Sequence, residues 1–155
     1  MAKAAAQLSE RAIVVFDPLL KTELAEAQAE SAEIDAALAR PDDGLAQSAQ
    51  TGQRWYDAEV HRIRGEILLT KSPADPAVAE EAFLAAVAIA QAQKTRSFEL
   101  RAALSLAKLY RATGRDADAH AALRPSLEGF SPTPEFPEIG EAFGFTAAIG
   151  GGAGG

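Results

Sequence analysis

The chain has 155 residues, carries a formal net charge of −7 and contains no cysteine. This length predicts one domain, and the missing cysteines exclude disulfides, thiolate metal sites and cysteine nucleophiles. An acidic chain is a poor ligand for nucleic acid, whose phosphates are bound by Lys and Arg, so we expect no nucleic-acid partner. Alanine dominates the 48% of hydrophobic residues and aromatic residues make up only 6%, which favours closely packed helices over strands.

Residues 1–17 are predicted to be an N-terminal extension that could be helical. Their longest apolar run, residues 12–16, is too short for the continuous core of a signal peptide. No stretch approaches the roughly 20 apolar residues of a membrane span. We therefore expect no membrane partner and a location in the cytoplasm.

A first helical unit is predicted over residues 18–51. Its first helix covers residues 18–30, and its second begins near Glu33. Pro41 interrupts this second helical pattern and Gly44 weakens the pattern after it, so we expect a kink or break there, with a short helix resuming to about Ala49.

The second unit covers residues 52–94 and contains two helices separated by the polar segment 71–76. Gly65 lies in the middle of the first helix, which predicts a close contact with another helix. Asp75 and Pro76 are expected to be the N-cap and first residue of the second helix. The predicted packing face of that second helix consists of Ala79, Phe83, Ala86, Val87 and Ala90.

The third unit covers residues 95–130. One helix is expected to end at Gly114 in the left-handed conformation, and Asp116 is expected to cap the next. Pro125 should kink or end that next helix near Leu123 or Arg124. Residues 131–149 are predicted to form a capping segment, and the glycine-rich residues 150–155 a disordered tail.

Small and large residues recur at matched positions in the three units, 40 or 42 residues apart, and resemble the tetratricopeptide signature. The third unit carries Leu106, Ala107, Tyr110, Gly114, Ala119 and Leu123; the second carries Gly65, Leu68, Ala79, Phe83 and Ala86; the first carries Leu24, Ala25, Gln28, Ala37, Pro41 and Gly44. The resemblance implies an all-α fold, an α-α superhelix (a TPR-like solenoid) of about three antiparallel helical hairpins over residues 18–130, with a C-terminal capping segment.

Two longer runs are similar to a narrower group. Residues 51–69 and 96–107 look like the C-terminal tetratricopeptide (TPR) region of bacterial adenylate/guanylate cyclase-like or transcriptional regulatory ATPases. This resemblance implies the regulatory C-terminal part of a larger signalling or transcriptional regulator. It transfers no catalytic activity, because the chain contains no cyclase or NTPase part.

Residue patterns typical of catalysis are missing from the sequence. There is no phosphate-binding loop and no dinucleotide fingerprint. The two histidines, His61 and His120, lie in different units, each with only an aspartate four residues earlier, Asp57 and Asp116. A metal site or a general base needs further groups. We therefore expect no enzyme activity, no cofactor and no metal.

In tetratricopeptide proteins the first helices of the hairpins line a concave face that binds partners, and the resemblance carries those contact positions onto this chain. The expected groove runs from an acidic to a basic end, with Arg101 and Arg111 binding carboxylates. Its predicted residues are Glu26, Glu30, Glu59, Arg62, Glu66, Arg101, Lys108 and Arg111.

These features together favour a protein–protein interaction or scaffold module whose partner is a protein or peptide. One alternative is a small-ligand sensor in which Trp55 and Tyr56 line a pocket, although an aromatic pair at this position is also typical of a core anchor. Another is self-association into a weak homodimer through apolar ends of the helix stack.

Overall fold

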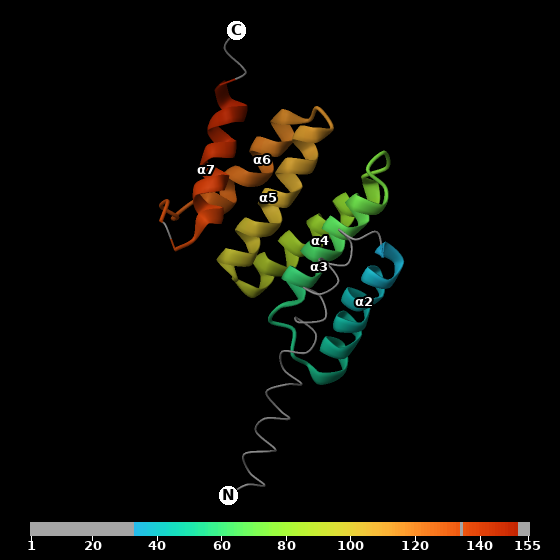
Figure 1. The fold of residues 1–155 in the computed structure, drawn as a ribbon. Coiled ribbons are helices and arrows are strands. Elements are labelled where there is room, and N and C mark those ends of the chain that lie inside the picture. The colour runs from blue at the N-terminus through green and yellow to red at the C-terminus, as the bar shows by residue number, and fades with distance from the viewer. Residues whose placement is uncertain (1–32, 134, 152–155) are drawn as a thin grey trace, which may run out of the picture.

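The computed structural model describes residues 33–133 and 135–151. Within these residues the chain is helical, and its only strand-like feature is an isolated bridge between Thr133 and Phe136. The helices, labelled in Figure 1, are α2 (Ile34–Thr51), α3 (Asp57–Lys71), α4 (Ala77–Gln93), α5 (Arg96–Ala112), α6 (Asp116–Leu127) and α7 (Pro137–Gly150).

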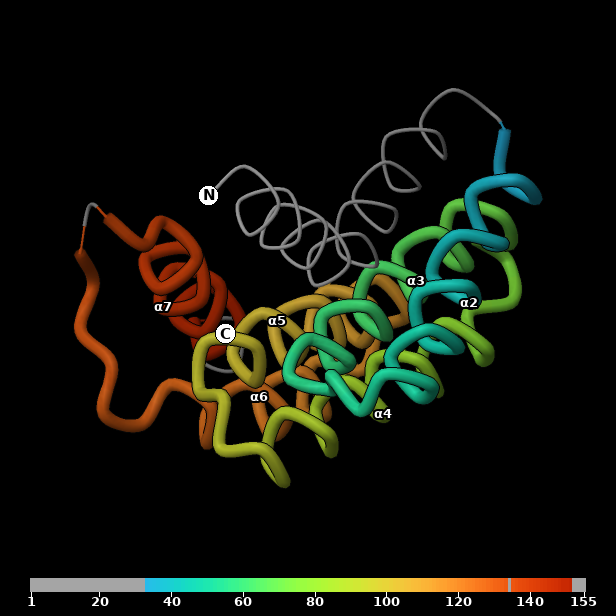
Figure 2. Tube along the Cα trace, turned by 90° about the horizontal axis from the view of Figure 1, so that it is seen from below, coloured from blue at the N-terminus to red at the C-terminus, as the bar shows by residue number. Residues whose placement is uncertain are grey.

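Each helix packs against the next one in the chain, so that α3 with α4 and α5 with α6 form antiparallel hairpins (Figure 1). Helix α5 also touches both α3 and α7, and these three helices lie in one row, with α4 and α6 below them in the view of Figure 2. The prediction of an all-α, repeat-like fold is confirmed. The predicted extension 1–17 and helix 18–30 lie outside the described residues.

Alanine and glycine let the two helices of the second hairpin approach closely. A Cβ atom added to Gly65 on α3 would lie 2.5 Å from Cε1 and 2.7 Å from Cδ1 of the Phe83 ring on α4. Phe83 is fully buried, as are Ala79, Ala86 and Ala90 on the same face. The close contact that Gly65 predicted is therefore confirmed.

Helix α2 runs without interruption through Pro41, so the predicted break is wrong. A proline inside a helix costs about 3 kcal/mol because it removes one backbone hydrogen bond and crowds the preceding turn. Here Pro41 and Gly44 belong to the buried face that α2 packs on α3. Two ion pairs, Arg64–Asp42 at 2.9 Å and Lys71–Asp35 at 2.6 Å, also hold α2 on α3. This packing offsets the local cost of the proline.

Further predictions about helix ends need correction. Helix α6 continues through Pro125 to Leu127, because Ser126 and Leu127 are buried in the core. Pro76 is the N-cap of α4, and α6 begins at Asp116 after Arg115, so neither aspartate caps as expected. Helix α7 extends to Gly150, the first residue of the predicted disordered tail, and residues 152–155 of that tail lie outside the described residues.

Gly114 adopts the predicted left-handed conformation, with φ of 75°. None of the helices over residues 33–133 and 135–151 combines the length and apolarity that crossing a bilayer requires.

Replacing Gly65 by alanine should destabilise the protein. Overpacking a core costs about 1–3 kcal/mol, and the better helix propensity of alanine returns up to about 1 kcal/mol. We expect a net loss of about 1–2 kcal/mol in the free energy of unfolding, measured by urea denaturation followed by circular dichroism. Gly140→Ala in α7 is the control, because nothing lies within 4 Å of its new Cβ. Equal effects of the two substitutions would contradict the close contact.

Candidate binding groove

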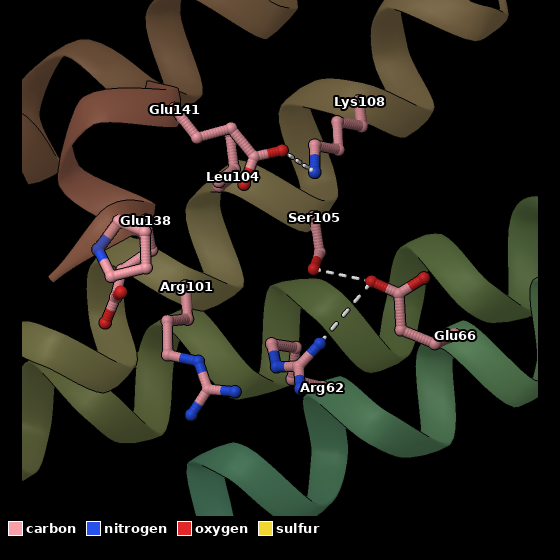
Figure 3. A pocket seen from close by; sticks show the side chains of 9 residues that line it. Arg62, Glu66, Arg101, Leu104, Ser105, Lys108, Glu138 and Glu141 are labelled. Atoms are coloured by element: carbon pink, nitrogen blue, oxygen red, sulfur yellow. Dashed lines mark hydrogen bonds and ion pairs between the residues drawn. The ribbon is translucent and has the colours of Figure 1, made fainter. Parts of the chain in front are cut away.

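A groove of about 440 Å³ lies along the row of first helices. Its walls come from α3, α5 and the start of α7 (Figure 3). Of the eight residues predicted for a binding groove, the structure brings four to this lining: Arg62, Glu66, Arg101 and Lys108.

Of the other four predicted residues, the two that the structure describes lie outside this lining. Glu59 is buried behind the groove, and its side chain is only 4% exposed. The guanidinium of Arg111 stacks 5.3 Å from the centre of the Phe145 ring on α7 and is not part of the groove lining. Glu26 and Glu30, which were to form the acidic end, lie outside the described residues.

Glu59 binds two arginines from two helices. Arg62, one turn later on α3, donates hydrogen bonds to both Glu59 oxygens, at 2.9 and 3.1 Å. Arg101 of α5 approaches the same carboxylate at 2.8 Å. A buried carboxylate needs such partners, because water no longer solvates it. This cluster joins α3 to α5 and fixes the floor at one end of the groove.

Glu66 lies about two turns after Glu59 on α3 and faces Ser105 of α5. It accepts a hydrogen bond of 2.7 Å from the Ser105 hydroxyl and lies 3.6 Å from an Arg62 nitrogen (Figure 3). Ser105 therefore orients the Glu66 carboxylate across the groove. No pattern in the sequence indicates this contact, because a single serine on a helix has many ordinary uses.

Helix α7 supplies the third wall, which the spacing of the first helices did not predict. Glu141 forms an ion pair with Lys108, and Glu138 also lines the groove (Figure 3). The lining therefore carries both signs of charge on α3, from Glu66 and Arg62, positive charge on α5 and negative charge on α7. The expected acidic end consists of Glu26 and Glu30, outside the described residues, so the predicted run from an acidic to a basic end stays a prediction.

A second hollow of about 310 Å³ continues the groove toward the loop between α3 and α4. The two hollows share Glu66, Ser105 and Lys108. The added lining is mainly apolar and consists of Leu69, Pro73, Pro76, Leu109 and Ala112 with Thr113. An elongated ligand could therefore place polar groups at one end and an apolar group at the other.

The aromatic pair does not form a two-ring pocket. Tyr56 is fully buried in the core, whereas Trp55 is exposed. Their ring centres lie 4.8 Å apart, edge to face. Tyr56 is thus the core anchor, and Trp55 is left as a surface side chain.

The structure gives neither histidine the surroundings of a metal site. In residues 33–133 and 135–151 there is no group of three His, Asp or Glu side chains arranged to hold a metal ion. Burial lowers the pKa of His61, although Asp57 opposes this effect; Arg64 lowers the pKa further and Asp42 raises it. Its partial burial on α3 therefore favours the neutral form of His61.

Comparison with known proteins identifies no relative: no family model, curated protein or solved structure matches the chain. The site must be interpreted from its own geometry.

Removing the Glu59 carboxylate should destabilise the fold. Breaking a buried ion pair costs about 3–5 kcal/mol, and we expect Glu59→Ala to fall near the lower end because Arg101 is half exposed. The control is Asp35→Ala, which removes an exposed ion-pair partner of Lys71 and should cost less than about 1 kcal/mol. Urea denaturation measures both, and similar losses would refute the structural role of Glu59.

Acid should weaken the fold through His61. The pKa of His61 is lower in the folded protein than its unfolded value of 6.5. As the pH falls, the imidazole is therefore protonated in the unfolded chain before it is protonated in the folded one. The stability that neutral His61 contributes is present above that value and is lost as the pH falls toward the folded pKa. Wild type should therefore lose more unfolding free energy than His61→Gln between about pH 7.5 and about pH 5.5. Parallel pH profiles of the two proteins would contradict the lowered pKa.

Proposed function

We propose that the protein is a protein–protein interaction module that binds an extended peptide segment of its partner in the groove between α3, α5 and α7. The observation that carries this proposal is the continuous groove itself, with charged side chains at one end and apolar ones at the other. Backbone and side-chain groups of a peptide match such a mixed lining better than a compact metabolite does.

The charged contacts of the groove differ in how easily a ligand can use them. Arg62 and Arg101 are committed to the buried Glu59 carboxylate. Lys108 and Glu141, in contrast, are each about half exposed, and an exposed pair of this kind contributes at most about 1 kcal/mol. A ligand carboxylate can therefore replace Glu141 on Lys108 at small cost.

The exposed ion pair of Lys108 and the apolar hollow beside it indicate which peptide side chains the groove binds. An acidic side chain of the peptide pairs with Lys108, and an apolar side chain a few residues away enters the hollow beside Leu69 and Leu109. Ser105 and Glu66 line both hollows and can bond to the peptide backbone.

The wider biological setting is also part of the proposal. The signature-like residues at Gly65, Ala107 and their neighbours, together with the repeat-like packing, support a tetratricopeptide-type module. In this proposal it acts without catalysis or cofactor, in the cytoplasm, as the regulatory part of a larger signalling or transcriptional regulator.

Fluorescence anisotropy with short labelled peptides tests the groove. Each peptide of the panel carries one acidic residue and one leucine a few residues apart. A matched panel has lysine in place of the acidic residue. Lys108→Gln should weaken binding of the acidic peptides about tenfold, the effect of losing one charge-assisted hydrogen bond. Glu141→Gln should strengthen it, because Lys108 loses its internal competitor.

Lys71→Gln is the matched control. Lys71 is 45% exposed and ion-paired, as Lys108 is at 49%, but it pairs with Asp35 and does not line the groove. Its substitution should leave affinity unchanged. Equal effects of the Lys71 and Lys108 substitutions, or equal binding of acidic and lysine peptides, would overturn the proposed site.

A further inference from the structure

The second helices of the two hairpins leave a groove between them. Helices α4 and α6 each pack on α5 but, among the helices of residues 33–133 and 135–151, not on each other. A hollow of about 400 Å³ lies between them. Its floor on α5 is formed by Leu106 and Tyr110, each about 200° around the helix from Lys108, since successive residues are about 100° apart. This hollow, the back groove, therefore faces away from the groove proposed for peptides.

The middle of the back groove is apolar. Leu84 of α4 stands at its rim and is 46% exposed, so an apolar side chain meets water there. Covering this surface with apolar groups of a partner is favourable. The apolar walls consist of Leu84 and Val87 on α4 and of Ala121, Ala122 and Pro125 on α6.

At one end of the back groove, the polar side chains already have partners inside the chain. Gln91 and Ser126 both donate to Oε1 of the buried Glu99, at 3.2 and 3.4 Å. Arg96 pairs with the other oxygen of Glu99 at 2.8 Å, so this end is neutral. An extended peptide would find little here to replace the hydrogen bonds that its backbone makes with water. A helix bonds its own backbone groups, so the lining favours a helix with one apolar face.

The opposite end carries an excess of negative charge. Arg115 faces two carboxylates there, Glu80 at 3.0 Å and Asp118 at 2.8 Å. Its guanidinium also lies 4.1 Å from the centre of the Tyr110 ring, which fixes it in place. One guanidinium cannot neutralise two carboxylates. The side chain of Asp118 is 54% exposed and Arg115 approaches it at Oδ2, so a cation from outside can reach this carboxylate.

We propose that the back groove binds an amphipathic helix of a partner protein, whose apolar stripe lies in the groove and ends in a Lys or Arg beside Asp118. Apolar residues three and four apart form such a stripe on a helix, and Leu84, Val87 and Gln91 follow the same spacing along α4. Charge favours this occupant over a second copy of the chain. Each copy carries −7 and would bring further negative charge to the acidic end.

The helix would bind independently of the proposed acidic peptide. The two grooves lie on opposite sides of α5, so that both can be occupied at once. The chain can then join an extended acidic segment to a basic amphipathic helix, from one partner or from two. Simultaneous occupation by one partner would raise the overall affinity above that of either groove.

Fluorescence anisotropy of the full chain with labelled helical peptides tests the back groove. Each peptide is held helical by a staple on its polar face, carries apolar residues three and four apart on the opposite face, and has one lysine a turn before this stripe. A matched panel has glutamate in place of the lysine. Wild type should bind the lysine peptides about tenfold more tightly, because the end of the groove beside Asp118 attracts one charge and repels the other.

Two substitutions separate the apolar and the charged contact. Leu84→Ala should weaken binding of both panels about fivefold, because less apolar surface is buried. Its matched control is Val78→Ala, since Val78 is also on α4 and 49% exposed but does not line the back groove. Asp118→Asn should remove most of the preference for lysine. Its matched control is Asp116→Asn, which changes the net charge equally at another exposed position of α6 outside the lining.

Several results would overturn the proposal. These are a failure of every lysine peptide to bind, equal losses in Leu84→Ala and Val78→Ala, and equal losses of preference in Asp118→Asn and Asp116→Asn. The last result would indicate attraction to the net charge of the chain alone. A wild-type dimer in sedimentation equilibrium that is lost in Leu84→Ala would assign the back groove to a second copy and also contradict the proposal.

Competition between the two kinds of peptide separates this inference from the proposed function. The acidic extended peptides should not displace a bound helical peptide, and displacement would place the helical peptide in the groove between α3, α5 and α7 and overturn the inference. Binding of the helical peptides without any binding of the acidic ones would count against the proposed function and support the back groove as a separate site.

Discussion

The close approach of α3 and α4 at Gly65 is the contact on which the arrangement of the other helices depends. The Phe83 ring occupies the space where a side chain would stand, and this seats α3 directly on α4. Because α4 also packs on α5, the same contact sets the position of α3 relative to α5. Glu59 and Glu66 then face Arg101 and Ser105 at bonding distance. The groove is thus a consequence of one absent Cβ atom.

Helix α5 carries Arg101 and Lys108 between carboxylates of α3 and α7, and the ion pairs on its two sides differ in strength. Toward α3, Arg101 meets a buried carboxylate, and such a pair is costly to break once formed. Toward α7, Lys108 meets a half-exposed one, and such a pair is weak. The structure therefore combines a fixed wall with a wall whose charge contact can be exchanged. This asymmetry is what suits the groove to reversible binding of an acidic peptide.

The sequence predicted the parts of the fold that rest on repeated apolar spacing: the hairpins after residue 52, the packing face around Phe83 and the close contact at Gly65. The predicted break at Pro41 and helix end at Pro125 are wrong, because the cost of a proline is local whereas the packing that offsets it comes from other helices. For the site, the resemblance to tetratricopeptide proteins put Arg62, Glu66, Arg101 and Lys108 on one face, and the structure brings these four to one groove lining. It could not reveal that Glu59 is buried or that Glu141 approaches Lys108, since partners distant in sequence leave no periodic signal.

Mapping amide chemical shifts of the isotope-labelled protein during titration with an acidic peptide tests the peptide groove most directly. The largest changes should cluster at Ser105, Lys108 and Glu141, on the walls of the groove, and Lys71 and Val78 should stay unaffected. Changes centred on α4 and α6, or no changes at peptide concentrations that saturate the anisotropy signal, would contradict peptide binding in this groove.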